Sequence, residues 1–272
     1  MAVKICFVIP TRNRAENLYL VLKSLSCQTL QDFEVVVVDD HSTDNTREML
    51  KEFDVKCCGM GRERLWNREP VYGTGIARNI AVEAAEPGTT HIWILDSDVI
   101  LNPRAVEHAV VEHLTTMPDV VVMGCHDWLA KGSRPTLQEL LAWDVADLKV
   151  QTADFHTLDP SWIWDCKRVV PITDSGGDHL IVPMAVYEAS GGFDEVMPAV
   201  GGIKCDDIDF MRSLREIGAK QVACKVMMGH HLWHEPHRDS VEVRQGIRIA
   251  QGYLYGKWTR GTKRRVVPNL FG

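Results

Sequence analysis

Two aspartates separated by a single residue, Asp96 and Asp98, stand out as groups that could bind a metal ion. They directly follow the apolar run 92–95, which predicts a buried strand. Because side chains alternate along an extended segment, both carboxylates are expected on one side, where they can face one cation. Mg²⁺ and Mn²⁺ take few carboxylates and keep positions open for phosphate oxygens. The pair therefore predicts a divalent-cation site that leaves room for phosphate oxygens, and the simpler alternative is a solvated turn.

Two further predicted strands also end in polar residues. Residues 10–14 (PTRNR) follow the first apolar run, and Asp39 and Asp40 follow the second. In an open parallel sheet, ligands bind at the carboxyl ends of the strands. We therefore expect these residues at the same edge of one sheet as the two aspartates above.

Acidic residues gather again in the second half of the chain. Asp206, Asp207 and Asp209 lie at the start of a helix predicted over residues 206–217. Carboxylates are favoured there by the helix dipole, so a purely capping role is one interpretation, above all for Asp206. Helical spacing places Asp209 away from Asp207, where it would orient its neighbours.

Four histidines crowd the segment 230–237, which is predicted to be a loop after a strand at 222–228: His230, His231, His234 and His237. Imidazole nitrogens bind zinc, and four of them would allow the site of a zinc hydrolase. Their spacing, however, does not define a tetrahedral arrangement.

Strand and helix signals alternate along the first half of the chain. Apolar runs cover residues 3–9, 33–38, 55–58, 92–95 and 120–123, and helical patterns lie between them at 18–25, 42–53, 75–85 and 103–114. This alternation predicts an α/β fold with a parallel, doubly wound sheet. The second half has fewer strand signals, and helices are predicted near 136–148 and 239–257.

The composition excludes several classes of protein. The chain has 272 residues, of which 45% are hydrophobic and 25% charged, and these values are typical of a globular protein. A formal net charge of −7 argues against a general nucleic-acid-coating protein. The eight cysteines form no C-x-x-C pair, as expected of reduced thiols, and no apolar stretch is long enough for a membrane span. We interpret the apolar start as a strand and expect a cytoplasmic protein.

Six motifs together resemble a known family: residues 8–14 (VIPTRNR), 37–44 (VVDDHSTD), 77–79 (ARN), 95–98 (LDSD), 191–195 (GGFDE) and 206–210 (DDIDF). The first four are similar to the nucleotide-sugar half of a GT-A glycosyltransferase of family 2, and the last two to its acceptor-side motifs. They follow in the expected order over about residues 3–235. Asp206 is a departure, since the family usually has Glu there, and the Trp-rich segment 126–175 matches no particular acceptor specificity.

The resemblance implies one GT-A catalytic domain over residues 1–272, a doubly wound mixed sheet with helices on both faces. Residues 1–125 would form the nucleotide-sugar-binding half, 126–235 the acceptor-side half, and 236–272 a C-terminal helix and basic tail. The implied activity is transfer of a sugar from a nucleoside diphosphate donor to an acceptor hydroxyl, with UDP-sugars favoured because most similar enzymes use them. A single base acting on the acceptor would invert the anomeric configuration.

By the same resemblance, the donor-binding residues are Pro10, Thr11, Arg12, Asp39, Arg78, Asp96, Ser97 and His234. The backbone of residues 10–12 would line the base pocket, Asp39 would bond the base, and Arg78 and His234 would lie near the diphosphate. Asp98 and His231 would hold Mn²⁺ or Mg²⁺, with His230 as the alternative ligand.

On the acceptor side, the resemblance implies that Asp207 is the catalytic base, taking a proton from the acceptor hydroxyl. Trp162, Trp164 and Asp206 are the acceptor-side candidates, the two tryptophans as a stacking surface for a sugar. The acceptor would be saccharide, lipid-linked or nucleic-acid-linked. The basic residues 257–265 either form a solvated end or meet an anionic acceptor.

Two other classes of function are weighed against this one. A non-catalytic nucleotide- or carbohydrate-binding protein would not need both Asp96 and Asp98 together with Asp207. A zinc hydrolase would contain zinc and bind no nucleotide. A sugar nucleotidyltransferase is rejected, because residues 10–14 contain neither glycine nor lysine.

Overall fold

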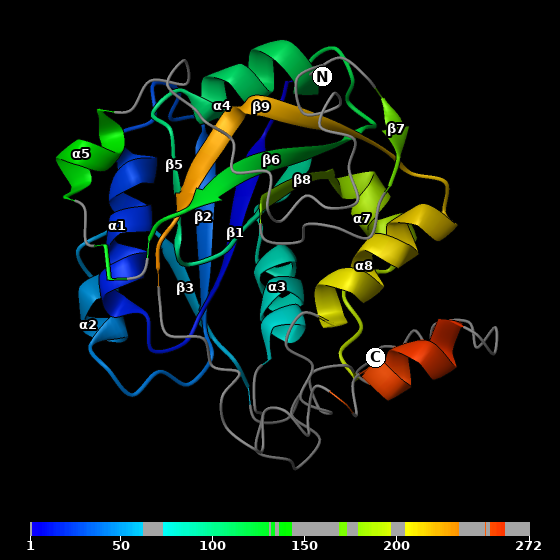
Figure 1. The fold of residues 1–272 in the computed structure, drawn as a ribbon, viewed down its shortest axis with the longest axis horizontal. Coiled ribbons are helices and arrows are strands. Elements are labelled where there is room, and N and C mark those ends of the chain that lie inside the picture. Colours follow the sequence, from blue (N-terminus) through cyan, green and yellow to red (C-terminus); the bar gives the residue numbers. More distant parts are fainter. Residues whose placement is uncertain are drawn as a thin grey trace.

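The computed structural model describes residues 2–61, 73–130, 132, 133, 136–142, 169–172, 179–196, 205–233, 248 and 251–258. At their centre is a nine-stranded mixed sheet with the strand order β3-β2-β1-β4-β8-β6-β9-β5, and β7 pairs with β9 (Figure 1). The strands are β1 (Ile5–Thr11), β2 (Phe33–Asp39), β3 (Lys56–Gly59), β4 (His91–Leu95), β5 (Val99–Leu101), β6 (Val121–Trp128), β7 (Val170–Pro171), β8 (His179–Pro183) and β9 (Lys220–His231).

Helices cover both faces of this sheet, as expected. They are α1 (Ala15–Ser26), α2 (Thr46–Leu50), α3 (Thr74–Glu83), α4 (Ala105–His108), the π-helical turn η2 (Ala109–Leu114), α5 (Leu137–Leu141), α7 (Met184–Ser190) and α8 (Cys205–Glu216). Residues 251–258 are also helical. Figure 1 shows α1 and α2 on the opposite side of the strands from α3 and α8.

The two layers follow from the alternation of side chains along buried strands. In β1, Ile5, Phe7 and Ile9 pack into one apolar core together with α1, α2 and α4, whereas Cys6 and Val8 pack into a second core with α3, α7 and α8. Both faces of β1 are therefore covered, which explains the continuous apolar run of its sequence.

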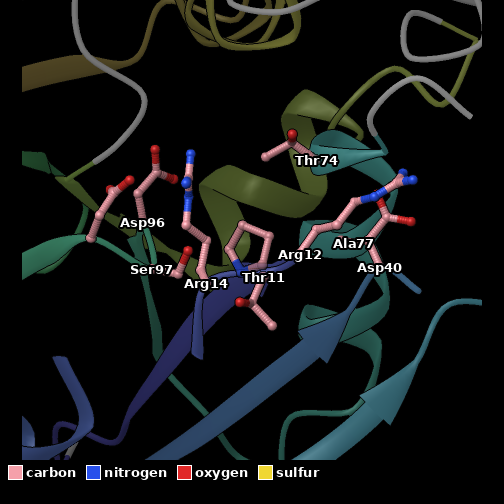
Figure 2. A pocket seen from close by; sticks show the side chains of 10 residues that line it. Thr11, Arg12, Arg14, Asp40, Thr74, Ala77, Asp96 and Ser97 are labelled. Carbon is pink, nitrogen blue, oxygen red and sulfur yellow. The ribbon is translucent and has the colours of Figure 1, made fainter. Parts of the chain in front are cut away.

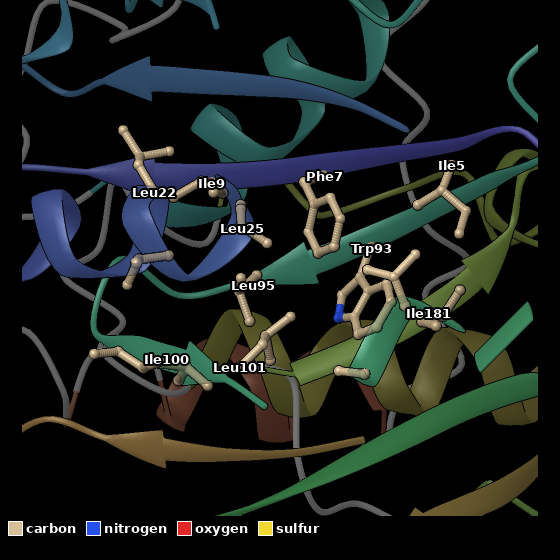
Figure 3. Packing of buried hydrophobic residues seen from close by; sticks show 14 of the residues in the cluster. Ile5, Phe7, Ile9, Leu22, Leu25, Trp93, Leu95, Ile100, Leu101 and Ile181 are labelled. Atoms are coloured by element: carbon tan, nitrogen blue, oxygen red, sulfur yellow. The ribbon is translucent and has the colours of Figure 1, made fainter. Parts of the chain in front are cut away.

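A buried tryptophan anchors the first of these cores. The rings of Phe7 on β1 and Trp93 on β4 stack with their centroids 4.7 Å apart (Figure 3). The Trp93 ring also stacks on that of His179. This packing holds together neighbouring strands whose carboxyl ends carry the predicted donor-binding residues.

Strand direction changes at β8, and again at β5 and β7, which both run antiparallel to their partner β9. β1 is parallel to β2 and β4, as the alternation predicts, but β8 runs antiparallel to both β4 and β6. The sheet is therefore mixed rather than purely parallel. Within the described residues, no helix is both long and apolar enough to cross a membrane.

Candidate active site

A pocket opens at the carboxyl ends of β1, β2 and β4, where the sequence placed the donor (Figure 2). Six of the residues predicted to bind the donor or the metal line it, and they are joined by four residues to which no such role was given, two of them (Arg14 and Asp40) expected at this edge of the sheet. The lining consists of Pro10, Thr11, Arg12, Arg14, Asp40, Thr74, Ala77, Asp96, Ser97 and Asp98. Figure 2 shows Arg12 extending toward Asp40 and Arg14 standing beside Asp96. The pocket thus combines basic and acidic groups.

The loops after β1 and β2 are joined through Asn13. Its side-chain oxygen accepts hydrogen bonds from the backbone N–H groups of Thr43, at 2.7 Å, and Asp44, at 3.4 Å. The backbone N–H of Asn13 in turn donates to the Ser42 hydroxyl at 2.9 Å. Asn13 and His41 both have positive φ, of 51° and 56°, a conformation that is uncommon for residues other than glycine. The two loops therefore form one hydrogen-bonded unit beside the pocket.

Asp39 and Asp40 differ in their surroundings. Asp39 is buried, and its carboxylate accepts hydrogen bonds from the Ser42 N–H at 2.9 Å and from Arg47 Nε at 2.6 Å. Asp40 lines the pocket and lies 3.6 Å from the Arg12 guanidinium. The role of Asp39 in binding the base stays a prediction, and Asp40 is the acidic residue of this strand end that borders the pocket.

The segment 96–98 is a turn and not the extended chain assumed from the sequence, so the alternation argument for its two aspartates is wrong. The N–H of Val99 donates to the Asp96 carbonyl at 3.2 Å, which closes the turn. The two carboxylates border the same pocket but have different neighbours. Asp96 bonds Arg78 at 2.7 Å, and Asp98 lies 3.4 Å from His231 Nε2.

His230 and His231 belong to β9 rather than to the predicted loop. Pairing of β9 with β5 places His231 opposite Val99 and His230 opposite Ile100. Adjacent residues in a strand point to opposite faces, so only one of the two histidines can face Asp98. That residue is His231, which is the neighbour expected to bind metal.

The two nitrogens of the His231 ring have different neighbours. Nδ1 lies 3.0 Å from the carbonyl oxygen of Leu232, a contact that requires a proton on Nδ1. Nε2, the other ring nitrogen, lies 3.4 Å from a carboxylate oxygen of Asp98. A ring nitrogen and a carboxylate oxygen that face each other in a buried place are suited to bind a metal cation.

Arg78 connects the two sides of the site. Its side chain is 1% exposed, and its guanidinium bonds Asp96 and Asp207 and lies 3.6 Å from Asp206. Burial alone would lower the pKa of Arg78, but the three carboxylates outweigh burial and raise it above its ordinary value. The guanidinium also lies over the Phe193 ring, 5.1 Å from its centroid.

The two adjacent aspartates of α8 have different environments. Asp206 is almost fully buried, and burial together with the charge of Asp207 raises its pKa to about 7, although Arg78 opposes the shift. The Asp207 side chain is 26% exposed and pairs with Arg78. Asp207 is therefore the carboxylate of this pair that a bound molecule can reach, and Asp206 is part of the buried support.

Comparison with known proteins identifies the family of this chain. Residues 6–161, more than half of the chain, match the family model described as glycosyl transferase family 2. The chain belongs to that family. A relative, validoxylamine A glucosyltransferase from Streptomyces hygroscopicus subsp. jinggangensis, is 28% identical over 245 residues, which are 84% of this chain and 55% of the relative. The chain thus spans about half the length of this curated relative.

Solved structures share the fold of this family 2 glycosyltransferase chain. S. aureus TarS in complex with UDP-GlcNAc aligns with a TM-score of 0.62 at 17% identity, over 93% of this chain and 67% of that chain. The mannosyltransferase PcManGT from Pyrobaculum calidifontis, in complex with GDP-Man and Mn²⁺, aligns with a TM-score of 0.57 at 17% identity, over 92% and 69%. At this level of identity the likeness establishes the GT-A fold alone.

One basic residue of the family 2 chain is not where its sequence suggested. Lys257, the first residue of the supposed basic tail, is buried, and its ammonium group bonds Asp194 and Asp209. The expectation of a solvated or acceptor-binding end is therefore wrong for Lys257, and residues 259–265 lie outside the described residues. Lysine is almost never buried unless it is paired. The sequence around Lys257 shows no such partner, and for this reason an exposed side chain was expected.

Several predicted residues of this family 2 chain lie outside the described residues: His234, His237, Trp162 and Trp164. The described residues contain no group of three or more His, Cys, Asp or Glu side chains that could hold a metal ion. Because His230 and His231 point to opposite faces of β9, the geometry offers no support for a zinc site built from all four histidines.

Proposed function

We propose that this chain transfers a hexosyl group from a nucleoside diphosphate sugar to an acceptor hydroxyl in a metal-dependent, inverting reaction. The observation that carries the proposal is the position of Arg78 between Asp96, which lines the pocket, and the partly exposed Asp207. A donor in the pocket and an acceptor at Asp207 would meet on two sides of one buried cation. Membership in glycosyl transferase family 2 supports the same reaction class.

Asp98 and His231 would hold Mn²⁺ or Mg²⁺. Their facing acceptor atoms, 3.4 Å apart, fit a small cation bound by oxygen and nitrogen. Such an ion supplies positive charge that stabilises the departing diphosphate. The Leu232 carbonyl would orient this ligand, because a hydrogen bond from His231 Nδ1 at 3.0 Å leaves Nε2 for the ion. Asp96 would then contact the ribose or a metal-bound water, as the resemblance implies.

In the transfer step, Asp207 would accept the proton of the acceptor hydroxyl. The hydroxyl oxygen forms a bond to the anomeric carbon while the bond from that carbon to the diphosphate oxygen breaks. The diphosphate leaves with the bonding electron pair. One base and one displacement invert the configuration of the sugar.

UDP-sugars remain the favoured donors, with a hexosyl group in keeping with the name of the Streptomyces relative. The structural neighbours were solved with UDP-GlcNAc and with GDP-Man, so one fold accepts different bases. The unit proposed to act is the single domain 1–272. A cytoplasmic location is supported by six described cysteines that are all free thiols.

The proposal is tested by incubating the protein with UDP-glucose, UDP-GlcNAc, UDP-galactose and GDP-mannose, each with Mn²⁺, Mg²⁺ or EDTA. We expect metal-dependent release of free nucleotide from one donor, with water or an added saccharide as acceptor, and loss of release in Asp98→Ala. Proton NMR of the first sugar released should show the inverted anomer. Retention of the anomeric configuration would contradict the inverting mechanism. Nucleotide release in the presence of EDTA would contradict the metal dependence. Nucleotide binding without release from any donor would favour a non-catalytic protein.

A further inference from the structure

A buried ion-pair cluster attaches the helical residues 251–258 to α8. The Lys257 ammonium donates to Asp194 Oδ2 at 2.7 Å and to Asp209 Oδ2 at 2.8 Å. Asp209 has no exposed surface, and the other two residues are each 8% exposed. One cation from the end of the described chain therefore lies between two carboxylates that belong to the acceptor-side motifs.

The two carboxylates accept further hydrogen bonds, including one from the Val196 N–H to Asp194 Oδ1 at 3.0 Å. The Tyr253 hydroxyl donates to Asp194 Oδ2 at 3.1 Å, and Trp258 Nε1 donates to Asp209 Oδ1 at 2.9 Å. Burial alone would raise the pKa of Asp194, but the bond from Lys257 and its charge lower it below the ordinary value. Without the lysine, two buried carboxylates would be left with no opposite charge, which is strongly unfavourable.

Both carboxylates are connected to the proposed reaction centre through neighbouring residues. Asp209 lies in the first turns of α8, two residues after Asp207. Asp194 follows Phe193, whose ring stacks on that of Phe210 in α8, with centroids 4.2 Å apart. Arg78 lies over the same Phe193 ring. Lys257 thus fixes the helix that carries Asp207 and the loop that supports its partner Arg78.

We propose that Lys257 is a positioning residue for the transfer step. It holds the start of α8 against the loop 191–196, so that the Asp207 carboxylate stays at Arg78, which also bonds Asp96 of the donor pocket. Lys257 is not among the residues that line this pocket, so it acts through Asp207 and not on the donor. This inference rests on the proposed function, in which Asp207 takes the acceptor proton.

The first test compares Lys257→Met with Lys257→Arg, and Lys51→Met serves as the control. Lys51 is an exposed lysine that pairs with Glu48 at the surface. Displacing a reacting group by about 1 Å can cost roughly 100-fold in rate. We expect kcat for nucleotide release to fall about 10–100-fold in Lys257→Met, less in Lys257→Arg, and not in the control. The Kd for UDP with Mn²⁺, measured by calorimetry, should stay within about twofold; an unchanged kcat, or an equal loss of UDP binding, would overturn the proposal.

A double-mutant cycle separates positioning from general weakening of the fold. If Lys257 acts through Asp207, adding Lys257→Met to Asp207→Asn should lower the remaining rate by less than about twofold, since coupled residues are not additive. A second full loss in the double variant would overturn the proposal. Should Lys257→Met fail to fold, Trp258→Phe removes a single bond to Asp209 and is expected to lower kcat about 2–10-fold with UDP binding unchanged; full activity in that variant would equally overturn it.

Hydrogen exchange gives a readout that needs no turnover. In Lys257→Met, the amides of the first turns of α8 should exchange at least about tenfold faster, while those of β1 and α1 keep the parent rates. Equal acceleration across all these elements, or none in α8, would overturn the positioning role. If no nucleotide sugar reacts but α8 responds as expected, the proposed function fails while the structural coupling to Asp207 stands.

Discussion

The donor side and the acceptor side of the site are held together by different forces. On the donor side, loops at neighbouring strand ends are joined by hydrogen bonds between side chains and backbone, such as those from the Thr43 N–H to the Asn13 side chain and from the Asn13 N–H to the Ser42 hydroxyl. On the acceptor side, carboxylates are held by buried cations far away in sequence, since Arg78 and Asp207 are 129 residues apart and Lys257 and Asp209 are 48 apart.

The two sides should therefore respond differently to substitutions that remove a charged side chain. Hydrogen bonds to backbone amides survive many changes of side-chain charge, so the donor pocket should tolerate neutral substitutions on the acceptor side. Buried ion pairs do not, because removing one partner leaves an uncompensated charge. Variants of acceptor-side carboxylates should therefore change catalysis or stability and leave donor affinity nearly constant.

The largest expected effect is the loss of the proposed base. Asp207→Asn keeps the size of the side chain and cannot accept a proton, so nucleotide release should fall about 10²–10⁴-fold. The affinity for UDP and Mn²⁺, measured by calorimetry, should remain that of the parent, since a group used only in the transition state does not contribute to ground-state binding. Full activity of this variant would remove Asp207 from the mechanism and leave the fold assignment intact.

A smaller effect is expected on the donor side at the metal. His231→Ala should raise the Mn²⁺ concentration for half-maximal nucleotide release by about 10–100-fold, the range of weakened metal sites. His230→Ala is the matched control, because its side chain points to the other face of β9. An equal shift in both variants would contradict the assignment of His231, rather than His230, as the metal ligand.

The smallest effect concerns stability and its dependence on pH. Asp206 has a pKa raised to about 7, so the folded state holds its proton more tightly than the unfolded state does. Its contribution to stability is therefore greatest below about pH 4 and is lost as the pH rises toward 7. Asp206→Asn should raise the free energy of unfolding by about 1–3 kcal/mol at pH 8, and the gain should vanish near pH 4.

Asp194→Asn provides the contrast, because the pKa of Asp194 is lowered and its stabilisation is present at neutral pH. That stabilisation is lost only when the pH falls below the ordinary aspartate value and through the folded one. Urea unfolding of both variants at pH 8 should give changes of opposite sign. The same sign for both would mean that Asp206 and Asp194 are not in differently charged surroundings.

The strand pattern of the first half could be predicted because β1, β2 and β4 are buried on both faces and read as continuous apolar runs. β5 was missed because its three residues follow Asp98 so closely that they resemble the continuation of a loop. The antiparallel β8 could not be assigned a direction, since the direction of a strand depends on a distant partner.

The donor-pocket residues were largely predictable, because strand ends in one sheet meet at one edge. The environments of individual groups were not. Two histidines indicated a loop, yet their strand pairing with β5 is a long-range property. The burial of Lys257 depends on two carboxylates 48 and 63 residues away in sequence. Residues next to Lys257 in the sequence cannot predict a pairing over such a separation.

The Asn13 bridge has a consequence for engineering this enzyme family. A single amide side chain in a left-handed backbone conformation binds the chain at residues 43 and 44, so the loops after β1 and β2 are mechanically one part. Grafting either loop alone from a homologue would pair the backbone N–H groups of one loop with a side chain from a different sequence, and the hydrogen bonds between the loops would be lost. An exchange of nucleotide preference between homologues should therefore transplant residues 10–14 and 39–44 together, as one cassette.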